Sequence, residues 1–284
     1  MRILIPLLAL ALTSCGTPSS GKPVLAASIY PISFLVSSIA GEEYEVMTIT
    51  PVGTEPHDYQ PTPSTVKRLY DAKAIFLNGY HFEGYASSFV SSLQEKSVYI
   101  GEKANSKTFD GVTDPHVWLS TLNYGLMAQG VLDSLCALNP AKEDLFKANY
   151  QTFKAKLDSL TSYCTNLSST FQNKTIAVSH AAYGYLCDQF HIEQLYISKL
   201  SPNVEPTQQA IEAVMDAIQE KGIDTVFFEE LASPEIANAI ASRTGAKTEM
   251  LHPLEGLTEE EEKAGKDYFS IYRENMDKIA RAKP

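Results

Sequence analysis

Short apolar runs rich in β-branched and aromatic residues alternate along the chain with longer segments of helical periodicity. Runs of this length that are separated by helices predict parallel strands. They fall into two sets of four, at 23–29, 44–50, 72–78 and 97–101, and at 174–179, 193–199, 224–230 and 246–251. The pattern therefore predicts an α/β protein with two open parallel-sheet lobes, each a (β/α)4 unit.

The helices between these runs carry recognisable start and stop signals. Thr62-Pro63 is typical of a helix start, and Ser233-Pro234 begins another helix that should stop at Gly245. Thr258 and Glu261 have the spacing of a capping box for the last helix. These signals place the predicted strands in loops that open onto helices.

A long uninterrupted helix is predicted at 141–171, after Asn139 as N-cap and Pro140 at the first helical position. Its apolar side chains recur every three or four residues: Phe146, Tyr150, Phe153, Leu157, Leu160, Cys164, Leu167 and Phe171. A rod of about 30 residues spans roughly 45 Å. We therefore predict an N-terminal lobe at 23–140, a connecting backbone helix at 141–171 and a C-terminal lobe at 172–284.

The first residues are typical of an export signal. Arg2 precedes an apolar run at 3–12 that is too short to span a bilayer. The run ends in Leu-Thr-Ser-Cys15, which resembles the lipobox of bacterial lipoproteins. We predict a signal peptide at 1–14, lipidation of Cys15, and a flexible tether at 15–22. The alternative is an ordinary secretory signal with a chance cysteine. Either places the chain in the cell envelope, outside the cytoplasm.

Charge and cysteine content narrow the function. The net charge is −11 and no block of Lys or Arg is present, which argues against nucleic acid and favours a small cation as ligand. Cys136, Cys164 and Cys187 allow at most one disulfide, whose pairing the sequence leaves open. The sequence contains no CxxC, which argues against a cysteine zinc site.

Four of the six histidines lie just past a predicted strand or ahead of a predicted helix. His57 is in the loop after the second strand, and His116 lies in Asp114-Pro115-His116 before a helix. His180 and His252 directly end two strands of the second set. Ligands of open α/β sheets bind at the carboxyl edge of the strands, so we expect these side chains to face one crevice between the lobes.

Neutral imidazole is a preferred zinc ligand, and four ligands in a tetrahedron form a closed zinc site. No local motif such as HExxH is present, so the fold must assemble the site. We expect Glu55 and Glu230 to accept hydrogen bonds from imidazole N–H groups. His81 and His191 are expected at the surface.

Four ordered motifs together resemble the ZnuA/TroA-type solute-binding proteins of metal ABC transporters. They are Glu55-Pro-His57-Asp-Tyr59, Asp114-Pro-His116-Val-Trp-Leu119, Ser179-His180-Ala-Ala-Tyr-Gly-Tyr185 and Leu251-His252-Pro-Leu254. The resemblance covers essentially the whole mature chain. It implies a periplasmic-binding-protein-like fold with a helical backbone and delivery of a metal ion to an ABC permease. Carried over by position, it implies His57, His116, His180 and His252 as metal ligands.

Many relatives have a carboxylate where this chain has His252, and manganese-type members have glutamate at the position of His180. Nitrogen ligands favour Zn²⁺ over Mn²⁺, so we expect zinc, with Mn²⁺ or Fe²⁺ as alternatives. The departure at His252 leaves open whether His252, water or Glu55 provides the fourth ligand. The stretch between Gly101 and Asp114 is short and holds no histidine run.

We expect a monomeric metal receptor rather than an enzyme. A zinc hydrolase with three histidines and a water is one alternative, which an open fourth position would favour. A metal-binding adhesin is another, because some members of the resembled family are described as adhesins.

Overall fold

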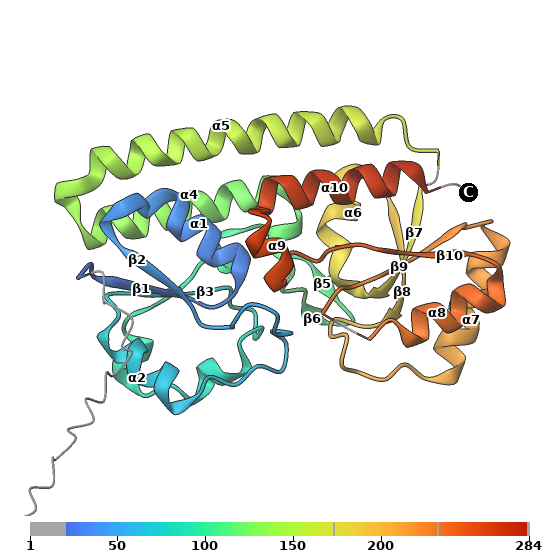
Figure 1. Ribbon diagram of the computed structural model, residues 1–284, viewed down its shortest axis with the longest axis horizontal. Coiled ribbons are helices and arrows are strands. Elements are labelled where there is room, and N and C mark those ends of the chain that lie inside the picture. Colours follow the sequence, from blue (N-terminus) through green and yellow to red (C-terminus); the bar gives the residue numbers. More distant parts are fainter. Residues whose placement is uncertain (1–20, 173, 232, 283–284) are drawn as a thin grey trace, which may run out of the picture.

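The protein is described by a computed structural model that covers residues 21–172, 174–231 and 233–282. The predicted signal peptide, Cys15 and most of the tether lie outside these residues. All eight predicted strands are present, in two parallel sheets that stand side by side (Figure 1). The first sheet contains β1 (Val24–Ala27), β2 (Glu45–Thr48), β3 (Ile75–Leu77) and β4 (Ser97–Tyr99); the second contains β7 (Thr175–His180), β8 (Glu193–Ser198), β9 (Thr225–Phe228) and β10 (Lys247–Met250). The predicted fold class is confirmed.

The two sheets repeat one topology. Their orders are β2-β1-β3-β4 and β8-β7-β9-β10, so each lobe places its second strand outside its first. Strand order reverses between β1 and β3, and again between β7 and β9. Loops leaving the carboxyl ends of such neighbouring strands diverge and create the crevice where ligands bind.

The predicted helix signals operate as expected. Thr62 caps the first turn of its helix through its side chain. Gly245 ends another helix with the left-handed φ of 80° that suits glycine. Thr258 and Glu261 form the capping box. The helices are α1 (Tyr30–Ala40), α2 (Pro63–Asp71), α3 (Ser91–Gln94), α4 (Thr121–Leu138), α5 (Glu143–Ser168), α6 (Gly184–Phe190), α7 (Gln208–Glu220), α8 (Glu235–Thr244), α9 (Glu259–Lys263) and α10 (Tyr268–Arg281).

Helix α5 extends along one side of both sheets (Figure 1) and packs against α1, α4 and α10. Its inward positions Phe146, Phe153 and Leu160 are buried, as the apolar spacing predicted. The helix begins at Glu143 rather than at 141, because Pro140 opens a short 3₁₀ turn before it. The division into lobes at 23–140 and 172–284 remains a prediction.

One element was not predicted, a small antiparallel hairpin of β5 (Thr108–Phe109) and β6 (Val112–Thr113). Asp110 and Gly111 both have positive φ, which matches the two-residue turn that twists with a hairpin. Asp110 pairs with Lys199 at 2.6 Å, beyond the end of β8. The hairpin therefore reaches from the first lobe to the second in the stretch between Gly101 and Asp114.

The segment after His116 is bonded to the second lobe. The indole N–H of Trp118 donates to the carbonyl of Pro253 at 2.8 Å. The hydroxyls of Tyr268 and Tyr272 donate to the carbonyls of Trp118 and Leu119, at 2.6 and 2.8 Å. All three side chains are buried in one apolar core that continues through both lobes. These bonds fix the position of His116 relative to the second sheet.

Cys136, Cys164 and Cys187 are free thiols. Within the described part of the chain, no helix combines the length and apolar character that crossing a bilayer requires.

Candidate metal centre

His180 is the last residue of β7, at the point where the strand order of the second sheet reverses. Its Nδ1 lies 2.5 Å from Oε1 of Glu229, which follows the neighbouring strand β9. A carboxylate can only accept here, so Nδ1 carries the proton and Nε2 presents its lone pair. The hydroxyl of Ser179 donates to the same carboxylate oxygen at 2.6 Å. Glu229 thus sets the tautomer that a metal ligand needs.

His116 is held in the same way by Asp114. One oxygen of Asp114 accepts the backbone N–H of His116 at 3.0 Å and lies 2.8 Å from its Nδ1. Burial of His116 favours the neutral ring, but the hydrogen bonds and charges of Asp114 and Glu255 outweigh it and raise the pKa of His116 to about 9. The residues flanking Pro115 therefore orient the ring and increase its basicity.

His57 comes from the loop after β2, where Oε1 of Glu55 accepts its backbone N–H at 3.0 Å. The ring packs against Phe82, with centroids 4.8 Å apart. Its Nε2 is buried and has no hydrogen-bond partner among the residues that the structure describes. This nitrogen points toward the rings of His116 and His180, whose centroids lie 5.4 and 5.5 Å from that of His57.

Glu255 provides the fourth donor atom of this cluster. Its Oε1 lies 3.4 Å from Nε2 of His57, 3.3 Å from Nε2 of His116 and 3.8 Å from Nε2 of His180. The Nε2 atoms of His116 and His180 are 3.3 Å apart. Ligands about 2.0 Å from a tetrahedral zinc ion lie about 3.3 Å from one another, so the four atoms are spaced as its ligands would be.

The electrostatics of Glu255 agree with this arrangement. Burial opposes its ionisation, but the surrounding histidines, His57 foremost, hold the pKa of Glu255 well below its usual range. Its Oε1 is buried, and no group in the described part of the chain makes a hydrogen bond to it. A buried anionic oxygen that faces three nitrogens is a costly arrangement without a cation to bind.

The structure does not place His252 with the other three histidines. The backbone N–H of Leu254 donates to its Nδ1 at 2.8 Å, and its Nε2 lies 3.2 Å from Glu261. A neutral ring held this way keeps its proton on Nε2 and has no lone pair to offer there. Leu254 has a φ of 63°, and this left-handed turn brings Glu255 into the cluster, where His252 was expected.

The two carboxylates expected to orient imidazoles do not do so for the cluster. Glu55 accepts a backbone N–H and bonds Asn203 at 2.8 Å, across the cleft in the second lobe. Glu230 is exposed and lies beside His252 and Glu261. The orienting partners are Asp114 and Glu229, the latter one residue earlier than expected.

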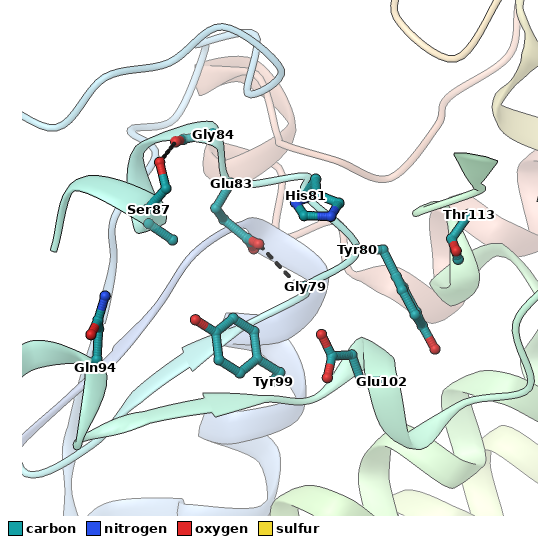
Figure 2. A pocket seen from close by; sticks show the side chains of 11 residues that line it. Gly79, Tyr80, His81, Glu83, Gly84, Ser87, Gln94, Tyr99, Glu102 and Thr113 are labelled. Atoms are coloured by element: carbon teal, nitrogen blue, oxygen red, sulfur yellow. Dashed lines mark hydrogen bonds between the residues drawn. The ribbon is translucent and has the colours of Figure 1, made fainter. Parts of the chain in front are cut away.

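His81 and His191 are exposed, as the sequence analysis expected. His81 lines a separate cavity of about 440 Å³ together with Tyr99 and Glu102 (Figure 2). In the same loop the buried carboxylate of Glu83 accepts the backbone N–H groups of Asn78 and Gly79 at 2.7 and 2.9 Å. Because Phe82 precedes Glu83 and packs on His57, this cavity's wall supports the cluster without joining it.

Sequence reasoning missed Asp114, Glu229 and Glu255. Asp114 carried a usable signal, since an acid two residues before a histidine recurs in Glu55-Pro-His57 and Asp114-Pro-His116. Glu229 and Glu230 are adjacent acids after a strand, and only strand register decides which one faces His180. Glu255 stands three residues after His252 in the same loop, where the turn at Leu254 decides the outcome.

Residues 25–282 match the model of the ZnuA family, described as zinc-uptake complex component A, periplasmic. The chain belongs to this family. Among its ZnuA-family relatives, the zinc-binding protein AdcA of Streptococcus pyogenes serotype M1 is 30% identical over 92% of this chain. The chain spans 56% of the length of that relative. The high-affinity zinc uptake system protein ZnuA of Bacillus subtilis is 26% identical, over 95% of this chain and 93% of its own.

Solved structures of ZnuA-family members agree in fold. The Zn(II)-bound ZnuA-like domain of Streptococcus pneumoniae AdcA matches with a TM-score of 0.81 and 30% identity, over 92% of this chain and 98% of that one. The laminin-binding protein Lmb of Streptococcus agalactiae matches with a TM-score of 0.84 and 26% identity, over 91% and 98%. Its title describes a bifunctional protein with adhesin and metal-transporting activity.

Removing the partner of His180 tests the geometry. Glu229→Ala should lower zinc affinity about 10–100-fold, because the ring loses the acceptor that fixes its tautomer. Glu229→Gln keeps an acceptor oxygen and should cost less. Competition against a chromophoric chelator measures both, with Glu235→Ala on the exposed first turn of α8 as the control. Equal affinities for Glu229→Ala and the control would refute this role.

Proposed function

We propose that this chain is an extracytoplasmic receptor that binds Zn²⁺ with high affinity and delivers it to a membrane ABC permease for uptake. The ion is held by His57, His116, His180 and Glu255. The observation that carries the proposal is the convergence of three imidazole nitrogens and one carboxylate oxygen, two of them buried without hydrogen-bond partners. Membership of the zinc-uptake family supports the same conclusion.

The donor set favours zinc over manganese. Three nitrogen donors and one oxygen donor suit a borderline-soft ion, whereas Mn²⁺ prefers an oxygen-rich shell with more ligands. The close spacing of the four atoms also suits a small tetrahedral shell. Mn²⁺ and Fe²⁺ are therefore expected to compete weakly at this site.

The same geometry favours binding over catalysis. A catalytic zinc site leaves a coordination position for water or substrate. Here Glu255 supplies a fourth protein donor from within the cleft. The ion is therefore enclosed as cargo, and the proposal does not include hydrolysis.

Attachment to the membrane would keep the receptor close to its permease. The lipobox-like sequence before Cys15 supports a lipid anchor there, followed by the tether at 15–22. A relative from Streptococcus pneumoniae, 31% identical over 96% of this chain, is named a zinc-binding lipoprotein. We propose the same location for this chain, in the cell envelope and outside the cytoplasm, acting as a monomer.

The test is metal competition on the purified mature chain. We expect Zn²⁺ to bind tightly and Mn²⁺ or Fe²⁺ to displace it only in large excess. His116→Ala should abolish tight binding, while His81→Ala, an exposed histidine outside the cluster, should not. Tight binding that survives His116→Ala, or a preference for Mn²⁺, would contradict the proposal.

A further inference from the structure

A second group of potential metal ligands lies beside the cluster. Glu230, His252 and Glu261 each offer one donor atom, and these atoms lie within 4.8 Å of one another. Nε2 of His252 is 3.2 Å from Oε2 of Glu261, close to the separation of two ligands on one zinc ion. Glu230 is exposed while His252 and Glu261 are buried. The group therefore leads from solvent into the protein.

One small pocket connects this group to the three-histidine cluster. Glu230 and His252 line it together with Glu255 and Glu229. Its free volume is about 10 Å³, the scale of a single water or ion. Glu255, buried and with its Oε1 lacking a hydrogen-bond partner in the described chain, lines the same pocket. An ion held by the outer group would share this pocket with a ligand of the inner site.

The charges of the outer group favour a cation. Burial opposes ionisation of Glu261, but hydrogen bonding to His252 lowers its pKa to about 2. The pKa of Glu230 is raised by burial and then by the charge of Glu261. Lys266 also faces both acids, although its ammonium pairs with Glu274 at 2.8 Å. A divalent ion between the two carboxylates would relieve their repulsion.

We propose that Glu230, Glu261 and His252 form a second, weaker site for a divalent transition metal ion, on the approach to the three-histidine cluster. This site rests on the proposed function, since it is a first stop for the same cargo. Exposed Glu230 meets the ion from solvent, and the shared pocket leads from there to Glu255.

The hydrogen bonds of His252 explain why this site is the weaker one. For Nε2 to bind a metal, its proton must move to Nδ1, and the bond from the N–H of Leu254 to Nδ1 must be given up. Glu261 also accepts the backbone N–H of Thr258 at 3.1 Å as part of the capping box. At the inner site, by contrast, Asp114 and Glu229 already hold the proton on Nδ1.

The test is a titration of the full-length mature chain with Zn²⁺, and with Co²⁺ as a coloured probe. We expect two ions per chain, the second weaker than the first by at least about tenfold. Glu230→Gln and His252→Asn should remove the second ion and leave the affinity of the first unchanged. Asn can still accept the N–H of Leu254, so this variant removes Nε2 while keeping the turn.

Glu260→Gln is the matched control, because Glu260 is exposed on the same helix as Glu261 and loses the same charge. It should keep both ions. A single ion in the wild type, or a second ion unaffected by Glu230→Gln and His252→Asn, would overturn this inference. Loss of the tight ion from the wild type would instead contradict the proposed function, so the two failures are distinguishable.

Discussion

Glu255→Ala should lower zinc affinity by more than about 100-fold, beyond the cost of losing a hydrogen-bond partner of a ligand. The substitution removes the only carboxylate whose oxygen lies within 3.8 Å of Nε2 of all three histidines, within the part of the chain that the structure describes. It also leaves three imidazoles whose mutual repulsion grows whenever one is protonated. Competition with a high-affinity chelator at neutral pH measures the effect.

His252→Asn is the informative comparison for this experiment. It should leave the tight affinity unchanged, because the ring of His252 faces Glu261 and carries its proton on Nε2. Circular dichroism of both variants checks that the fold is retained. If His252→Asn lost the tight ion and Glu255→Ala kept it, the ligand set would be four imidazoles, and the arrangement described for the Leu254 turn would not be the metal-bound one.

Zinc affinity should fall steeply with decreasing pH. The pKa of His116 is raised to about 9, so in the metal-free protein its ring is cationic at neutral pH and zinc must displace a proton. Each displaced proton costs about tenfold in affinity per pH unit below that pKa. We therefore expect a loss of about 100-fold or more between pH 8 and pH 6, and a gain that levels off only above pH 9.

Calorimetry in buffers of different ionisation heats measures the proton directly. About one proton per zinc ion should be released at pH 7.5 from His116 alone. Asp114→Asn removes one of the charges that raise the pKa of His116, so this variant should release less and show a shallower pH dependence. Affinity that stays constant between neutral and acid pH would count against histidine ligation altogether.

The sequence by itself determined the fold class and most of the ligand set. Eight strands and the long helix could be predicted, because parallel strands and amphipathic helices write their periods directly into the order of apolar residues. Three imidazoles, at His57, His116 and His180, could be predicted because they end strands or precede helices, where the two sheets open. The β5–β6 hairpin was missed although Asp110-Gly111 is a recognisable turn signal, because strands of two residues leave no periodic pattern.

Tertiary structure alone decided the fourth donor and the partners of the rings. The positive φ of Leu254, costly for a residue with a side chain, turns His252 toward Glu261 and Glu255 toward the histidines. Strand register selects Glu229 over Glu230 as the partner of His180, since adjacent residues leave a strand on opposite sides. Both choices depend on contacts between distant segments, so the same local sequence would fit either arrangement, and only packing at the junction of the two sheets separates them.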